Sequence, residues 1–256
     1  MNTKVKKSFQ KTNLGQYFRK RRERRKLQKW TPGDEKRLLF YSSLIPVSGL
    51  IFDIGANLGN RTKIFSRMGA TVTAVEPQTF CYDVLDSFFK RNDKVTVIKA
   101  ALDEEEGESE IFISDAHTIS SMSPGWIKAV KESGRFSKYN WERKEIVNVT
   151  TLDRMIELYG DPDFIKIDVE GFEDKVISGL SKPVRLLSLE FTPEYLAPVL
   201  NSLDHLNSLG PLEVNYSLGE FMALELGKWE NIFNIKELLR SLDKSLFGDL
   251  YVRHVG

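Results

Sequence analysis

The chain has 256 residues, enough for one large α/β domain with a full hydrophobic core but short for two complete domains. Its composition, 41% hydrophobic and 29% charged, is ordinary for a soluble globular protein, and no run reaches the ~18 apolar residues of a membrane span. The single cysteine, Cys81, excludes an intramolecular disulfide, so we expect a cytoplasmic protein without a transmembrane segment.

The net charge of +1 conceals two parts of opposite sign. Residues 1–37 carry 14 Lys or Arg against 3 acids, whereas residues 38–256 carry 23 basic against 33 acidic residues. We therefore expect a basic N-terminal arm (1–37) on an acidic domain (38–256). Such an arm can bind nucleic acid, an anionic membrane surface or a phosphorylated carrier, or it can pack as a partly helical segment on its own acidic domain.

Strands and helices alternate along the acidic domain, after an expected helix at 35–45. This rhythm predicts a parallel sheet with right-handed crossovers. The expected strands are 50–54, 71–75, 95–100, 164–168 and 186–191, with closing strands at 212–217, 221–226 and 249–253, the last of them antiparallel. The expected helices after the first are 60–68, 79–91, 151–159, 172–180 and 193–209.

The rhythm breaks between residues 103 and 150. We expect short strands at 110–114 and 145–150 and a mostly irregular stretch at 117–143. An insertion of this length inside a compact domain is usually functional. We predict that it forms a flap over the substrate side of the site.

The stretch from residue 50 to 59 reads LIFDIGANLG, a buried strand that runs into a turn with two glycines. Such a turn brings bare backbone against a nucleotide-like cofactor at the open edge of a sheet. Asn57 stands where dinucleotide-binding loops carry their middle glycine, which argues against a pyrophosphate and hence against an NAD-dependent oxidoreductase. Asp53 would repel phosphates but attract the sulfonium and ammonium groups of S-adenosylmethionine. The loop therefore predicts this cationic cofactor.

Two other strand ends supply acids. Glu76 follows the second strand, about 20 residues past the glycines, where a carboxylate can accept hydrogen bonds from ribose hydroxyls. Asp168 ends the strand at 164–168, and strands that flank the switch point of such a sheet deliver their last residues to one crevice. Alternation along that strand puts Lys166 on the same face as Asp168. We expect Asp168 beside the cofactor loop.

Four segments together resemble the FkbM family of S-adenosylmethionine-dependent methyltransferases: DIGANLG at 53–59, EP at 76–77, TLD at 151–153 and IKIDVEG at 165–171. The resemblance covers about residues 48–195. It implies a class I methyltransferase (Rossmann-like) α/β fold, a three-layer sandwich around a mainly parallel seven-stranded sheet with an antiparallel last strand. It also implies methyl transfer to a hydroxyl of a saccharide or polyketide-like product.

The same resemblance implies which residues contact the cofactor. The matching positions are Asp53, Gly55, Asn57, Gly59 and Glu76, and we predict such contacts also for Ala56, Ala101 and Asp168. The acceptor hydroxyl needs a group within hydrogen-bond reach that can take its proton.

Three residues are candidates for that base: Asp168, Glu170 and His117. Asp168 can equally hold the methionine amine of the cofactor, and Glu170, preferred on the resemblance, can instead stabilise the start of the following helix. His117 lies in the expected flap, where a lone histidine is more often simply solvated. We predict acceptor contacts by Ser120, Ser121 and Lys166.

No required metal is predicted, because only Asp168, Glu170 and Glu190 could gather a cation, and acids from separate positions are weak support. The leading hypothesis is an O-methyltransferase of a saccharide, glycolipid or carrier-linked glycan, with the arm docking a phosphate-bearing carrier or membrane surface. One alternative is a nucleic-acid methyltransferase guided by the arm, although DVEG replaces the NPPY-type tetrapeptide of amino methylases at 168–171. The other is a non-catalytic binding protein that keeps the cofactor fold.

Overall fold

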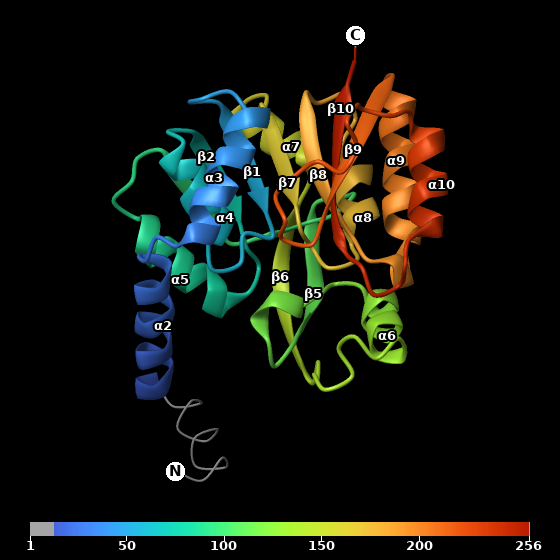
Figure 1. Cartoon of the computed structure of the whole chain (residues 1–256). Coiled ribbons are helices and arrows are strands. Elements are labelled where there is room, and N and C mark those ends of the chain that lie inside the picture. The colour runs from blue at the N-terminus through green and yellow to red at the C-terminus, as the bar shows by residue number, and fades with distance from the viewer. Residues whose placement is uncertain (1–12, 256) are drawn as a thin grey trace.

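A seven-stranded sheet forms the centre of the molecule (Figure 1), shown by a computed structural model that describes residues 13–255. Its strands are β1 (Leu50–Ile54), β2 (Thr71–Val75), β3 (Val95–Ile98), β7 (Phe164–Ile167), β8 (Leu186–Phe191), β9 (Leu212–Leu218) and β10 (Gly248–His254). They lie in the order β3-β2-β1-β7-β8-β10-β9. The first five pair in parallel, while β10 is antiparallel to both of its neighbours. The mainly parallel sheet with an antiparallel last strand is thus confirmed.

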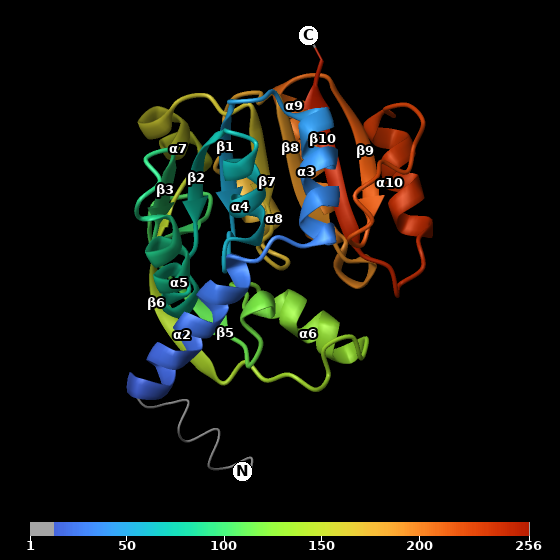
Figure 2. The same cartoon turned by 60° about the vertical axis from the view of Figure 1, so that its left-hand side comes forward.

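Helices cover both faces of the sheet and complete the predicted three-layer sandwich. One face packs against α3 (Pro32–Leu44), α4 (Asn60–Arg67) and α5 (Thr79–Phe89), and Figure 2 shows α3 and α4 in front of the strands. The other face packs against α7 (Leu152–Tyr159), α8 (Glu173–Ser178), α9 (Ala197–Leu209) and α10 (Ile232–Ser241). Since both faces are covered, every residue of β7 is buried, as the continuous apolar runs of parallel strands predict.

The insertion folds into a layer of its own rather than an irregular flap. β4 (Ala101–Leu102), β5 (Gly107–Ile113) and β6 (Arg143–Thr150) form a three-stranded sheet. The 3₁₀ turn η1 (His117–Ile119) and the helix α6 (Pro124–Glu132) lie in the segment that connects β5 to β6. Figures 1 and 2 show β5, β6 and α6 below the main sheet, on the same side as α2. The prediction of a mostly irregular stretch at 117–143 was wrong where α6 forms.

The helix α6 has identifiable local causes. Ser123 accepts a hydrogen bond from the backbone N–H of Trp126, and Pro124 occupies the first helical position. Trp126 and Val130, four residues apart, are buried on one side of the helix. This pattern of cap, proline and paired apolar residues was a readable signal of a helix.

The C-terminal third also differs from the prediction. Residues 221–226 are almost all apolar, as in a buried strand, but they form a loop, with Met222 buried at a φ of 49°. A helix, α10, follows instead, because Asn231 caps its first turn and Ile235 and Leu239 bury one side. The main sheet therefore closes with two strands, β9 and β10, rather than three.

Residues of the basic arm pack on the domain. α2 (Asn13–Leu27) lies along α5, where Lys20 pairs with Asp83 and the Arg19 guanidinium lies 4.0 Å from the ring centre of Phe80. Leu27 is buried in the core under α3 and α4. Of the two expectations for the arm, packing on its own domain is observed for this helix; residues 1–12 lie outside the described residues. The predicted boundary at residue 37 falls inside α3, which begins three residues before the expected helix at 35–45.

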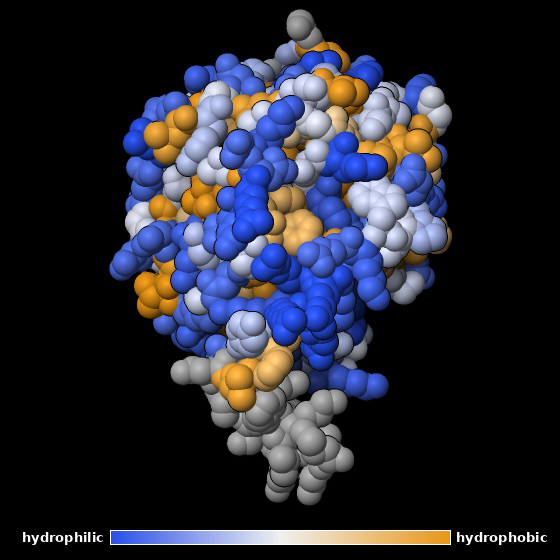
Figure 3. All heavy atoms as spheres, turned by 90° about the vertical axis from the view of Figure 1, so that its left-hand side faces the viewer, coloured by the Kyte–Doolittle hydropathy of each residue, from blue (hydrophilic) through white to orange (hydrophobic). Residues whose placement is uncertain are grey.

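The start of α2 presents exposed apolar side chains. Leu14, Tyr17 and Phe18 are each half exposed or more. Figure 3 shows a few hydrophobic side chains near the lower end of this face, below a broad hydrophilic area. Within residues 13–255, no helix combines the length and apolar character that crossing a bilayer requires.

Candidate active site

A cavity of about 460 Å³ opens at the carboxyl ends of β1, β2, β7 and β8. The insertion contributes one wall through residues 117–122, and α2, α3 and α4 contribute another. Of the residues predicted for the site, only Gly59 does not line this cavity. Strand ends that lie far apart in sequence meet here because the topology brings the first, second and fourth strands side by side.

The glycines of the loop have different tasks. Gly55 has a φ of +76°, and a Cβ there would lie 1.9 Å from the carbonyl oxygen of Asp168, so only glycine fits between β1 and β7. Gly59 has a φ of +91° and its missing side chain makes room for Leu85 on α5. Gly55 thus forms the cavity wall, whereas Gly59 serves the packing of the helix that follows.

Asn57 joins the loop to the insertion. Its Nδ2 donates to the carbonyl of His117 at 2.9 Å, and its Oδ1 lies 2.7 Å from Nδ1 of His117. Because an amide oxygen only accepts, Nδ1 of His117 carries the hydrogen and its Nε2 keeps a lone pair. Burial lowers the pKa of His117, which favours the neutral ring. The residue that replaces the middle glycine of dinucleotide-binding loops therefore fixes the position of η1.

Two buried carboxylates flank the loop. Asp53 is 1% exposed and accepts a hydrogen bond from Thr62 on α4, and burial raises its pKa. Glu76 accepts the backbone N–H groups of Asn57 and Gln78, both at 2.8 Å. Burial raises the pKa of Glu76 to about 7, although these two hydrogen bonds lower it. A cationic ligand would offset the cost of burying both charges.

A cluster of acids lies next to the glycine loop, at the ends of β7 and β8. Asp168, Glu170 and Glu190 each place a carboxylate oxygen within 4.8 Å of the others. The Lys166 ammonium, itself 1% exposed, lies 2.9 Å from Asp168 and 3.5 Å from Asp249, which pairs with Glu190 across β8 and β10. The absence of a required metal stays a prediction.

The pKa values of the three acids in this cluster shift in different directions. Burial raises the pKa of Asp168, but the Lys166 ammonium, the Arg61 charge and a hydrogen bond with Glu190 together lower it more, so this pKa lies below its ordinary value. Burial, with the adjacent Asp168 charge, holds the pKa of Glu170 well above its usual range, and the same holds for Glu190 beside Glu170. Glu170 also has a φ of 57°, an unfavourable backbone conformation of the kind that gathers at functional sites.

The serines predicted to bind the acceptor make contacts inside the protein. Ser120 donates to Gln78 at 2.8 Å, and Gln78 donates to the carbonyl of His117 at 2.9 Å. Ser121 donates to the backbone carbonyl of Glu170 at 2.7 Å. These bonds position the insertion against Glu76 and Glu170. Acceptor contacts by Ser120, Ser121 and Lys166 stay predictions.

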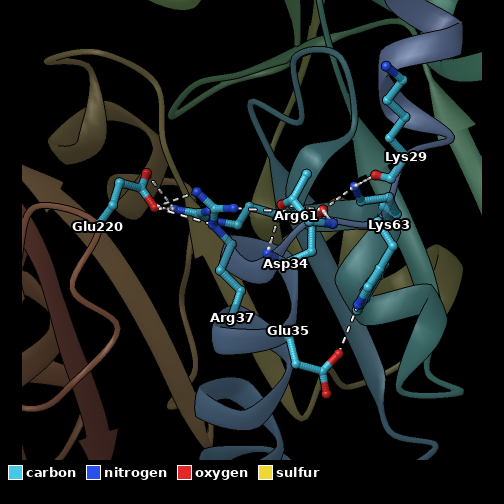
Figure 4. A network of polar contacts seen from close by, with 9 residues as sticks. Lys29, Asp34, Glu35, Arg37, Arg61, Lys63 and Glu220 are labelled. Carbon is cyan, nitrogen blue, oxygen red and sulfur yellow. Dashed lines mark hydrogen bonds and ion pairs between the residues drawn. The ribbon is translucent and has the colours of Figure 1, made fainter.

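Sequence reasoning missed a basic side of the cavity, drawn in Figure 4. Arg37 and Arg61 both point at Glu220, while Lys63 bonds Asp34 at 2.9 Å and the carbonyl of Lys29 at 3.1 Å. Arg61 and Lys63 directly follow the glycine loop, which was a usable signal. Glu220 comes from the loop after β9, and nothing in the sequence ties it to α3 and α4.

A family model for the methyltransferase FkbM domain matches residues 53–212, well over half of the chain. The chain belongs to the FkbM methyltransferase family. This FkbM protein is accordingly a methyltransferase with a class I fold, and its cofactor is S-adenosylmethionine, as predicted. A search of curated proteins found no match.

Solved structures similar to this FkbM enzyme are distant in sequence. A precorrin-6Y C5,15-methyltransferase from Geobacter metallireducens has 13% identity and a TM-score of 0.44, with 86% of each chain covered. A TehB-like methyltransferase from Corynebacterium glutamicum has 9% identity and a TM-score of 0.43, covering 93% of this chain and 96% of that one. An O-methyltransferase from Bacillus cereus in complex with SAH has 11% identity and a TM-score of 0.43, covering 89% and 83%.

The carboxylates and other polar groups that line the cavity fit S-adenosylmethionine. The cofactor carries two positive charges on its amino-acid end, and the wall around Gly55 supplies Asp53 and Asp168. Glu76, which accepts the backbone N–H of Asn57, also lines the cavity, as do Ala56 and Ala101. These groups are mostly anionic hydrogen-bond acceptors. They suit the sulfonium and the ribose hydroxyl groups of S-adenosylmethionine better than a pyrophosphate.

Proposed function

We propose that the enzyme methylates a hydroxyl oxygen of a saccharide, with a glycolipid or carrier-linked glycan as the acceptor class. The observation that carries this proposal is the cluster of Asp168, Glu170 and Glu190 on the cavity wall. Carboxyl oxygens accept hydrogen bonds whether or not the group carries a proton, and hydroxyl groups donate them. A polyhydroxylated acceptor therefore complements this side of the cavity.

S-adenosylmethionine supplies the methyl group on a positively charged sulfur, so no acid is needed for the leaving thioether. The protein must align the acceptor oxygen and take its proton. We assign the proton to Glu170, because a carboxylate with a raised pKa is a stronger base once ionised. Asp168, which Lys166 keeps ionised, is the positioning group beside the cofactor. Nε2 of His117 is the other base that the site offers.

The charge distribution of the cavity supports a carrier-linked acceptor. Lys26 and Lys29 are exposed at one side of the cavity, next to the partly buried Arg37 and Lys63. An acidic interior suits a neutral sugar, whereas a basic rim suits phosphate groups outside it. The exposed apolar start of α2 fits a peripheral contact with a membrane surface from the cytoplasm.

The test is methyl transfer from labelled S-adenosylmethionine to three panels: free and nucleotide-linked sugars, polyprenyl-diphosphate-linked glycans, and RNA. We expect label in an alkali-stable sugar ether with the second panel at the highest kcat/KM. Glu170→Gln should lower kcat by about 10²- to 10⁴-fold and leave the affinity for S-adenosylhomocysteine within about twofold. Label in RNA alone would favour the nucleic-acid alternative, and no transfer to either the sugars or the glycans would contradict the proposed acceptor.

A further inference from the structure

Two arginines in the cavity wall share one carboxylate. Nη2 of Arg61 lies 2.9 Å from both carboxylate oxygens of Glu220. Nη2 and Nε of Arg37 lie 3.1 and 3.3 Å from one of the same oxygens. Figure 4 shows the two guanidinium groups converging on Glu220 from α3 and α4. Converging guanidinium groups are a typical arrangement for binding a carboxylate or phosphate.

The arginines are buried more deeply than the acid that they hold. The side chains of Arg61 and Arg37 are 13% and 22% exposed, against 54% for Glu220. Glu220 lies between Gly219 and Met222, which both have positive φ, in the loop that leads from β9 to α10. The arginines thus belong to packed helices, while their partner comes from an exposed loop, which can move at lower cost.

The hydrogen bonds of Arg61 are incomplete. Its Nε is buried and has no hydrogen-bond partner among residues 13–255. A buried guanidinium N–H without a partner is costly, and a ligand that reaches it would recover that cost. Arg61 is one of the residues that line the cavity, and Glu220 covers its guanidinium group there.

Apart from Glu220, the nearby carboxylates do not form close ion pairs with both Arg37 and Arg61. Asp34 is committed to Lys63 at 2.9 Å and lies 3.6 Å from Nη1 of Arg37. Asp53 and Asp249 are close enough to affect Arg61 or to be affected by it electrostatically, but neither is within ion-pair distance of it. Despite the partial burial of Glu220, the two arginines lower its pKa, so it is held as an anion.

We propose that Arg37 and Arg61 form an anion-binding site of the catalytic cavity, which Glu220 occupies in the ligand-free protein and which a carboxylate or phosphate of a bound ligand takes over. Two ligands offer that chemistry: the α-carboxylate of the cofactor, and an acidic group of the acceptor. The second source rests on the proposed function, whereas the first does not.

Calorimetric titration of three probes tests this site. S-adenosylhomocysteine carries the carboxylate, 5′-methylthioadenosine has the same adenosine and thioether but no amino-acid group, and inorganic pyrophosphate represents a phosphorylated acceptor. Glu220→Gln removes the internal competitor, so the anionic probe that uses the site should bind about 5- to 10-fold more tightly. Glu225→Gln, in the same loop but without an ion pair among the described residues, is the matched control and should change no affinity.

The arms distinguish the two sources. Tighter S-adenosylhomocysteine with unchanged methylthioadenosine assigns the site to the cofactor carboxylate, and tighter pyrophosphate assigns it to the acceptor. Arg37→Gln should weaken the same probe by a similar factor. If Glu220→Gln does not fold, Glu220→Asp, which is too short to reach both arginines, replaces it. The proposal is overturned if both anionic probes bind as in wild type, or if methylthioadenosine gains as much as they do.

Discussion

At the scale of single residues, opposite pKa shifts divide the labour among neighbouring acids. Lys166 keeps Asp168 ionised, while burial and the Asp168 charge favour a proton on Glu170. Such a pair of acids with separated pKa values is typical of an active site. The sequence allowed Asp168 and Glu170 to be placed in one cleft, but not their different protonation, which depends on burial and on the distance of each carboxylate from Lys166 and from the other.

Glu170 as the base predicts a specific pH dependence. Its raised pKa means that it is protonated, and unable to take a proton, up to a higher pH than an ordinary glutamate. We expect kcat/KM to rise with pH through a value above the usual glutamate range. Glu170→Gln should abolish this limb of the profile as well as most of the rate. An unchanged limb in the variant would assign it to another group, of which His117 is the first to examine.

Glu173 gives a stability prediction of known sign. Burial raises its pKa to about 7 from 4.5, although it accepts the backbone N–H of Gly171 at 3.1 Å. The folded state holds the proton more tightly, so this contribution to stability is complete below about pH 4.5 and is lost as pH rises through 7.

Between pH 5 and 7.5, the free energy of unfolding of the wild type should therefore fall by about 2–3 kcal/mol more than that of Glu173→Gln. Urea denaturation at several pH values measures this difference. Equal pH dependence of the two proteins would show that Glu173 ionises normally in the folded state.

At the scale of elements, the insertion is held to the sheet by close packing. Gly171, just after β7, has a φ of +85°, and a Cβ there would lie 2.3 Å from the side chain of Trp126 on α6. Gly134, after α6, has nearly the same φ of +86° but open space around it. Substitutions at these two glycines therefore distinguish the cost of an unfavourable backbone conformation from the cost of a side-chain clash.

We expect Gly171→Ala to lower the free energy of unfolding by about 2–4 kcal/mol, since it combines a strained φ with a clash. Gly134→Ala should cost about 1 kcal/mol, from its backbone alone. Denaturant unfolding of both variants gives the comparison. Equal losses would mean that α6 moves away freely and does not restrain the turn after β7.

The predictable elements were those that a single local pattern defines. Strands β1, β2, β7 and β8 read as short apolar runs, and their ends carry Asp53, Glu76 and Asp168, so both the sheet and the cofactor wall followed from the sequence. Residues 221–226 misled because an apolar run alone cannot show that the chain turns at Met222. The basic side was missed because Arg37, Arg61 and Glu220 come from three separate elements.

At the scale of the whole molecule, the cavity is divided by charge. Acids from four strand ends line its interior, and cations from α2, α3 and α4 line one side. The basic N-terminal part and the acidic domain thus both contribute residues to one cavity, because α2 packs on α5. In the proposed function, the acidic interior binds the sugar and the basic side binds the phosphate groups of its carrier.

Calorimetric titration of the wild-type protein with S-adenosylhomocysteine, with NAD⁺ in parallel, tests the central claim most directly, namely that the cavity behind Asp53, Gly55 and Glu76 binds a methyl donor. We predict one S-adenosylhomocysteine bound per chain, no heat from NAD⁺, and at least tenfold weaker binding by Gly55→Val, whose side chain would collide with the Asp168 carbonyl. Binding of NAD⁺ without S-adenosylhomocysteine, or equal binding by Gly55→Val, would contradict the account.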